Sequence, residues 1–130
     1  NQFHPKDLPG ALLEIDSVPN TVHTEKYSDW PPAGDNWRKS INEEYVQGII
    51  GVTIATSEPE KLGKLWAEVL DSKFEIDNKF FRVVLENANI IFVKSKNNYT
   101  DLVGVKIKSS IKRQNLGKNI KMLGLDIEFV

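Results

Sequence analysis

The chain has 130 residues, a length that suits one domain and leaves little room for a second complete one. Hydrophobic residues make up 40% and charged residues 27%, which is ordinary globular usage and excludes a wholly disordered chain. The 17 Lys and Arg residues nearly balance the 18 Asp and Glu residues and are interspersed with them, so the basic patch of a nucleic-acid-binding protein is missing.

Cysteine and long apolar segments are both absent from the sequence. Without cysteine, disulfides and thiolate metal sites are excluded, and a reducing compartment is permitted. The longest apolar runs, such as residues 90–93, are far shorter than the ~20 residues that span a bilayer. We therefore expect a soluble, cytoplasmic protein with neither nucleic acid nor membrane as a partner. The first residue is Asn rather than Met, which suggests that the sequence begins inside a longer gene product.

The first 44 residues predict two segments without a regular helix. Residues 1–16 carry turn residues around Leu8-Pro9-Gly10, followed by the short apolar run Ala11 to Ile15, and this pattern is typical of an irregular hairpin. Residues 17–44 are rich in proline and contain Trp30 and Trp37, with neither helical nor alternating periodicity. They predict an ordered connector whose tryptophans anchor it to the domain surface.

Residues 45–98 predict a complete βαβββ module. Tyr45 to Thr56 is β-branched and apolar, as in a buried strand. Ser57 to Glu60 matches a capping box with Pro59 in the first turn, and five apolar residues then follow at helical spacing: Leu62, Leu65, Trp66, Val69 and Leu70. Three short strands are expected next, over residues 73–76, 80–86 and 89–94.

Residues 99–130 predict the start of a second module. Leu102 to Lys108 is strand-like, and apolar residues recur at helical spacing over Ser110 to Leu123. Gly124 is placed to end that helix in a left-handed cap. Ile127 to Val130 then predicts a further strand.

An internal repeat supports the two-module organisation. Gly51 to Ile54, which reads GVTI, recurs as GVKI at Gly104 to Ile107, while residues 1–3 and 11–15 resemble residues 78–80 and 88–92 on one common offset. We therefore predict an α+β fold of paired βαβββ modules in permuted order, in which the hairpin 1–16 completes the second module. The alternative is a fragment of a tandem protein, whose half-module a partner chain completes by swapping in a homodimer.

The segment His4-Pro5-Lys6, followed by Ala11 to Ile15, resembles the end of methylmalonyl-CoA epimerase and other members of the vicinal oxygen chelate superfamily, which includes glyoxalase I and the bleomycin-resistance proteins. Their strand in this position reads G-V-L-I-E-L and its Glu is a metal ligand, which Glu14 matches. Gly51 to Ile54 resembles the family's opening strand, commonly His-Val-x-Ile. The resemblance implies a glyoxalase/bleomycin-resistance-like fold with a cleft for a small organic molecule.

The sequence departs from the family at the metal ligands. The opening-strand positions are Gly51 and Gly104, and the position equivalent to Glu14 in the other module is Ile91, so one of the four implied ligands remains. A single carboxylate does not hold a catalytic divalent ion. Two hypotheses follow. One is a small-molecule-binding domain with a degenerate metal site, and the other is a lyase, isomerase or dioxygenase-like enzyme that uses Zn, Ni, Co, Mn or Fe with Glu14 as a ligand.

Several other residues are candidates for the cleft or the metal. His4, next to Pro5, is either a second metal ligand or a turn residue, and His23 in the connector is more typical of a solvated side chain. Trp30 and Trp37 are candidates to close one end of the cleft. Arg82 and Lys106 are candidates to meet an anionic ligand in the sheet's concavity, although solvated basic side chains are commoner.

Overall fold

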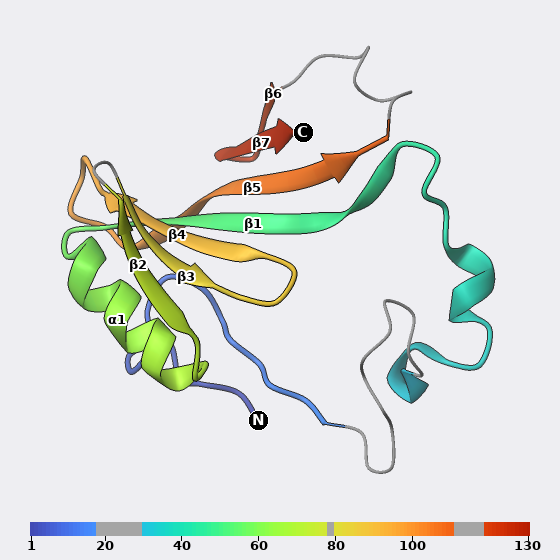
Figure 1. The fold of residues 1–130 in the computed structure, drawn as a ribbon, viewed down its shortest axis with the longest axis horizontal. Coiled ribbons are helices and arrows are strands. Elements are labelled where there is room, and N and C mark those ends of the chain that lie inside the picture. The colour runs from blue at the N-terminus through green and yellow to red at the C-terminus, as the bar shows by residue number, and fades with distance from the viewer. Residues whose placement is uncertain (18–29, 78–79, 111–118) are drawn as a thin grey trace.

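The computed structural model describes residues 1–17, 30–77, 80–110 and 119–130. It contains one α-helix, a seven-stranded sheet and two 3-10 turns (Figure 1). The strands are β1 (Val46–Thr56), β2 (Lys73–Asp77), β3 (Phe80–Val84), β4 (Asn89–Lys94), β5 (Asp101–Ser109), β6 (Asn119–Met122) and β7 (Leu125–Phe129). Helix α1 spans Pro59–Val69, and no helix in these ranges is both long and apolar enough to cross a membrane.

The sheet has the strand order β2-β3-β4-β1-β5-β7-β6. β1 runs parallel to β4, β5 runs parallel to β7, and the two central strands β1 and β5 are antiparallel. In each half, the central strand pairs with a parallel strand, and that strand pairs on its other side with an antiparallel one: β1, β4 and β3 in the first half, and β5, β7 and β6 in the second. The predicted α+β class is confirmed, and residues 46–94 form the expected βαβββ unit.

The core lies between α1 and one face of the sheet. Leu62 and Trp66 on the helix pack against Ile54, Val83 and Phe92, which lie on β1, β3 and β4. The rings of Trp66 and Phe92 lie 6.2 Å apart in a tilted arrangement. Because side chains alternate along a strand, these core positions direct their neighbours in sequence to the opposite face.

The start of α1 differs from the predicted capping box. The N-cap residue is Glu58, without a side-chain cap hydrogen bond, and Pro59 takes the first helical position. Thr56 Oγ1 instead accepts a hydrogen bond from the Glu58 amide at 3.4 Å. Leu65, which was predicted to lie on the buried stripe, is exposed at the stripe's edge.

The N-terminal hairpin packs on the helix side of the sheet. Leu8 is buried in the same core as Ile54 and Trp66, and Trp66 Nε1 donates a hydrogen bond to the Pro9 carbonyl at 3.1 Å. Gly10, at φ +112°, lies so close to Ile54 that a Cβ would be 2.7 Å from it. Among the described residues the hairpin pairs with itself and not with β7, so its predicted role as the last strands of the second module is wrong for a single chain.

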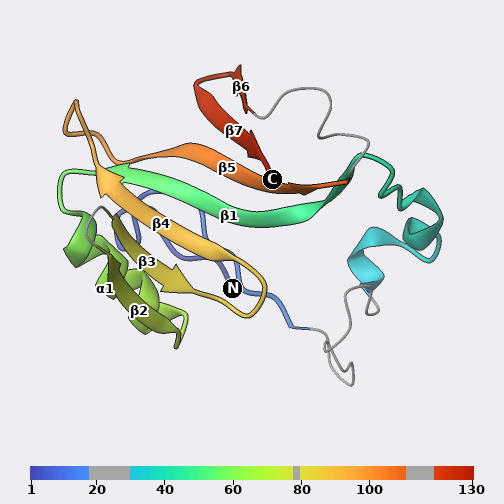
Figure 2. The same cartoon turned by 45° about the horizontal axis from the view of Figure 1, so that its top comes forward.

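Residues 119–123 form a strand and a turn where a helix was predicted. β6 and β7 make a hairpin with Leu123 and Gly124 as its two-residue turn, at φ +51° and +85°. Positive φ at both positions is typical of a type I′ turn, whose twist matches that of paired strands. The remainder of the predicted helix, residues 111–118, lies outside the described residues. The second half-module therefore supplies its own outer strands (Figure 2).

The connector projects from one end of β1, away from α1 (Figure 1). Its described part contains two short 3-10 turns, Pro31–Ala33 and Trp37–Ser40, with no buried residue in either. Trp30 and Trp37 are both half-buried, and their anchoring on the domain surface stays a prediction.

Candidate functional site

A pocket of about 360 Å³ lies on the sheet face opposite α1. Four strands of both halves contribute to it, and it is lined by Gly51, Val52, Thr53, Ile91, Val93, Val103, Gly104, Val105, Lys106, Asp126 and Glu128. Strand alternation explains its position, because Ile54 and Phe92 enter the core while Thr53 and Ile91 point the other way. The pocket therefore lies between the two halves of the sheet.

Two glycines form the middle of this pocket. Gly51 lies opposite Lys106, and Gly104 lies opposite Thr53, in the antiparallel pairing of β1 with β5. A Cβ built on Gly51 would lie 3.5 Å from Lys106 Cβ, and one on Gly104 would lie 3.3 Å from Thr53 Cβ. The side chains of Thr53 and Lys106 thus share the face onto which a side chain at either glycine would project.

Charged side chains border the pocket on the β7 side. Lys106 Nζ lies 3.4 Å from Glu128 Oε2, with 41% and 52% of the two side chains exposed. Asp126 pairs at 2.9 Å with Lys121, which lies on β6 outside the pocket lining. On the opposite side the walls are apolar, from Ile91 and Val93. The arrangement joins an apolar wall to a polar edge, as is common in small-molecule sites.

Arg82 lies on the same sheet face, one strand beyond Ile91, but does not line the pocket. Its Nη2 donates a hydrogen bond to Glu75 Oε2, while Lys73 Nζ lies 2.7 Å from Glu75 Oε1. The hydrogen bond from Lys73, followed by that from Arg82, lowers the pKa of Glu75 below its ordinary value. Arg82 Nε is buried and has no hydrogen-bond partner within the described ranges. Arg82 is therefore held at the margin of the site by an ion pair.

Glu14 and His4 lie on the N-terminal hairpin and not in the pocket lining. Glu14 is exposed and accepts a hydrogen bond from Gln2 Nε2 at 3.3 Å. His4 Nδ1 accepts a hydrogen bond from the Lys6 amide at 3.1 Å, the arrangement of a turn residue. No group of three or more His, Cys, Asp or Glu residues suited to a metal ion occurs in the described part of the chain, and His23 lies outside it.

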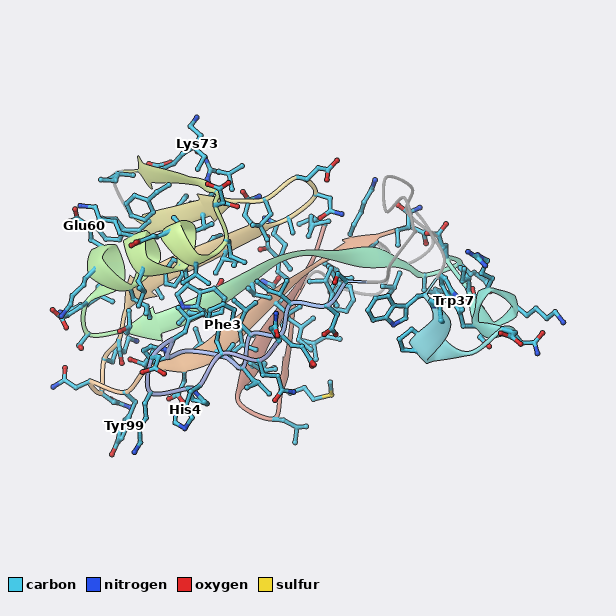
Figure 3. All side chains as sticks on the ribbon, turned by 90° about the horizontal axis from the view of Figure 1, so that it is seen from below. Phe3, His4, Trp37, Glu60, Lys73 and Tyr99 are labelled. Carbon is cyan, nitrogen blue, oxygen red and sulfur yellow. The ribbon has the colours of Figure 1, made fainter. Side chains whose placement is uncertain are left out.

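Trp30 and Trp37 line a separate hollow of about 210 Å³ in the connector, together with Arg38. The Arg38 guanidinium carbon lies 5.1 Å from the centre of the Trp37 ring, a cation–π contact. Figure 3 shows Trp37 on the projecting connector, at the opposite end of the molecule from Glu60 on α1. The structure does not bring the two tryptophans to the sheet pocket.

Thr53, Asp126 and Glu128 also line the pocket and were not predicted from the sequence. The signal for Asp126 and Glu128 is the two-residue period of Leu125 to Phe129, in which apolar and acidic residues alternate. That period becomes informative once β7 is known to pair with β5, because Asp126 and Glu128 then lie beside Gly104 and Lys106. Lys106 was considered for the concavity and does line it.

Comparisons with known proteins support the fold class. No family model matches the chain, and no curated protein is significantly similar to it. A solved structure of a hypothetical protein from Staphylococcus aureus is similar at TM-score 0.59 and 14% identity, covering 73% of this chain and 36% of that one. This chain therefore spans about a third of that protein's length. Methylmalonyl-CoA epimerase from Mycobacterium tuberculosis is more loosely similar, at TM-score 0.47 and 13% identity, with coverage of 69% and 91%.

Proposed function

We propose that this chain is a small-molecule-binding domain of the glyoxalase/bleomycin-resistance-like kind, and that its ligand occupies the sheet pocket without a metal. The observation that carries the proposal is the position of the pocket. It lies at the junction of the two halves of the sheet, on the face that α1 leaves open. Mixed apolar and charged walls from four strands favour binding of a small organic molecule over a purely structural role for this face.

A larger hollow of about 780 Å³ lies on the helix side of the sheet and is a weaker candidate for the ligand site. It lies along the flank of α1 beside β3 and β4, and most of its lining residues are charged: Glu58, Glu60, Lys61, Lys64, Glu68 and Lys94. Several of these already pair with each other on the exposed helix, as Lys64 does with Glu60 at 2.7 Å. Paired, solvated side chains on one helix are typical of an ordinary surface, whereas ligand sites combine apolar walls with a few polar groups.

The metal-dependent enzyme remains the second proposal, carried by one observation. In the first half of the sheet, Thr53 of β1 pairs with Ile91 of β4. In the second half, the equivalent residue Lys106 of β5 pairs with Glu128 of β7. A carboxylate therefore occupies the position in β7 that is equivalent to Ile91. The residues present do not fit a catalytic divalent ion. The pocket lining offers only the carboxylates of Asp126 and Glu128, and no group of three possible ligands occurs in the described ranges.

The position of the ligand is testable by nuclear magnetic resonance. Titration of the ¹⁵N-labelled protein with a library of small organic molecules is expected to shift the amides of Gly51, Thr53 and Gly104 for the molecules that bind. Ile91→Ala is expected to weaken binding because it removes part of the apolar wall, whereas the matched control Leu65→Ala on the exposed side of α1 leaves it unchanged. Shifts confined to α1 or to the connector, or a library without a binder, would overturn the proposal.

The metal alternative is tested by elemental analysis of protein purified with Zn, Ni, Co, Mn or Fe present. The metal-free proposal predicts less than one metal per chain. A stoichiometric metal that is lost in Glu14→Ala or Glu128→Ala would instead support the enzyme, and the variant that loses the metal would identify the carboxylate that binds it.

A further inference from the structure

The two glycines in the middle of the sheet pocket are unusual for their position. Gly51 and Gly104 lie inside the two central strands, where glycine costs about 0.5–1 kcal/mol relative to alanine. Neither glycine has a positive φ, so no turn conformation requires them. Glycine inside a strand often marks a place where a ligand or another backbone approaches closely.

The surroundings of each glycine favour a ligand. A Cβ at Gly51 would lie 3.3 Å from the Asn89 carbonyl oxygen, and one at Gly104 would lie 3.3 Å from the Asp126 carbonyl oxygen. These approaches are tight, but they leave room for a small shift of the neighbouring strand. A Cβ would also project into the pocket that both glycines line. The bare backbone of the two strands therefore provides a flat floor between Thr53 and Lys106.

The charge of the lining favours a cation. Within the lining, Asp126 and Glu128 provide two carboxylates and Lys106 provides one ammonium group. Lys121, which lies outside the lining, pairs with Asp126, and because 86% and 67% of the two side chains are exposed, solvent screens that pair strongly. The lining therefore has one more negative charge than positive charges. This charge lies on the β7 side of the pocket, opposite the apolar wall of Ile91 and Val93.

We propose that the ligand is a flat, mostly apolar ring system that is cationic at neutral pH, whose ring lies on Gly51 and Gly104 and whose positively charged N–H groups face Asp126 and Glu128. This inference rests on the proposed function, because it concerns the ligand of the same pocket. The ring would contact Ile91 and Val93 at its apolar side. The charged N–H groups would be a second partner for Glu128, which pairs with Lys106, and for Asp126, which pairs with Lys121.

Three acridines of similar shape and different charge provide the probes: 9-aminoacridine, which is protonated at neutral pH, acridine, which is neutral, and acridine-9-carboxylate. Fluorescence titration of the wild-type protein is expected to give at least about tenfold tighter binding of 9-aminoacridine than of the other two. In Asp126→Asn with Glu128→Gln, that preference is expected to disappear while the affinity for neutral acridine stays unchanged.

The floor is tested by Gly51→Ala and Gly104→Ala. Each is expected to weaken 9-aminoacridine binding at least about tenfold while the melting temperature stays within a few degrees of the wild type, since alanine suits a strand better than glycine. Gly63→Ala is the control, because a Cβ there would lie 2.6 Å from the Phe74 ring in the core. It is expected to lower the melting temperature and leave the affinity of the folded protein unchanged.

The outcomes separate this inference from the proposed function. Equal binding of the three acridines, or unchanged binding in both alanine variants, would overturn the flat cationic ligand. If other library molecules still shift the amides of the sheet pocket, the proposed function stands without it. If nothing binds there, both proposals fail.

Discussion

Val52 and Val105 lie opposite each other across the two central strands, with Gly51 opposite Lys106 on one side and Thr53 opposite Gly104 on the other. This reciprocal pairing relates the two halves of the sheet by an approximate twofold axis at its centre. The GVTI and GVKI repeats of the sequence are therefore antiparallel neighbours. Each copy contributes a glycine and a polar side chain to the same pocket, so the repeat has a direct consequence for the candidate site.

The hairpin 1–16 is predicted to be part of the folded core and not a detachable segment. Only 1% of Leu8 is exposed, and it packs with Ile54 and Trp66. Leu8→Ala is expected to lower the free energy of unfolding by about 2–4 kcal/mol, through lost burial and the cavity left behind. Leu12, in the same hairpin, is 62% exposed, so Leu12→Ala is expected to change it by less than about 0.5 kcal/mol. Urea denaturation of both variants measures the difference, and similar values would contradict the docking of the hairpin on α1.

Packing at the helix–sheet interface gives a second prediction. Gly63 lies in α1, where alanine normally stabilises a helix by about 0.8–1 kcal/mol. Here the added Cβ would lie 2.6 Å from Phe74 and 3.2 Å from Phe92, so overpacking is expected to outweigh the propensity and leave Gly63→Ala less stable by about 1–2 kcal/mol. Glu68→Ala on the exposed side of the same helix is the control, and chemical denaturation is the measurement. A more stable Gly63→Ala would show that α1 lies farther from β2 and β4.

The elements with a strong local pattern are the ones that the sequence predicted well. β4 has the predicted bounds, and α1 follows the apolar stripe of residues 62–70 because one helix face meets the sheet. The arrangement of elements was harder to predict. The resemblance of residues 11–15 to 88–92 indicated a strand, but Leu8 and the Trp66 hydrogen bond to Pro9 place the hairpin on the helix layer. Such a contact joins residues far apart in the chain and leaves no periodic signal.

The β6–β7 hairpin shows why the rest of the second module was mispredicted. Ile120 and Leu123 suit a helical stripe, yet Ile120 pairs with Ile127 across two strands. The competing signal is a turn at Leu123-Gly124 that requires positive φ twice, and leucine disguises it because Asn or Asp is preferred at the first position. The pocket residues Asp126 and Glu128 were missed because their place beside Gly104 and Lys106 depends on the parallel pairing of β7 with β5, which joins residues far apart in the chain.

That turn provides a third prediction. Leu123 is 96% exposed at φ +51°, so its side chain gives little packing and its backbone is strained. Leu123→Asn is expected to raise the free energy of unfolding by roughly 0.5–1 kcal/mol, whereas Gly124→Ala is expected to lower it by about 1 kcal/mol. A helix over 110–123 would give a lower stability for Leu123→Asn, because asparagine is a poorer helix former than leucine. The sign of the change in thermal or urea denaturation therefore distinguishes the two structures.

The carboxylate of Glu75 provides a pH-dependent prediction. Hydrogen bonds from Lys73 and then Arg82 lower its pKa in the folded protein below the ordinary value of 4.5. A lowered folded-state pKa means that the unfolded chain binds the proton more readily, so the ion pair stabilises the fold above about pH 4.5. That contribution is lost as the pH falls from there through the lowered value.

Glu75→Gln keeps the shape of the side chain and removes this titration. The wild type is expected to melt at a higher temperature than Glu75→Gln at neutral pH, and the difference is expected to shrink as the pH falls below 4.5. Because the group is solvated, added salt is expected to reduce the difference at neutral pH as well. Glu86→Gln, in the exposed turn between β3 and β4, is the matched control for the loss of one acidic charge. A difference that stays constant with pH, or that Glu86→Gln reproduces, would show that Arg82 is not held by Glu75 at the margin of the pocket.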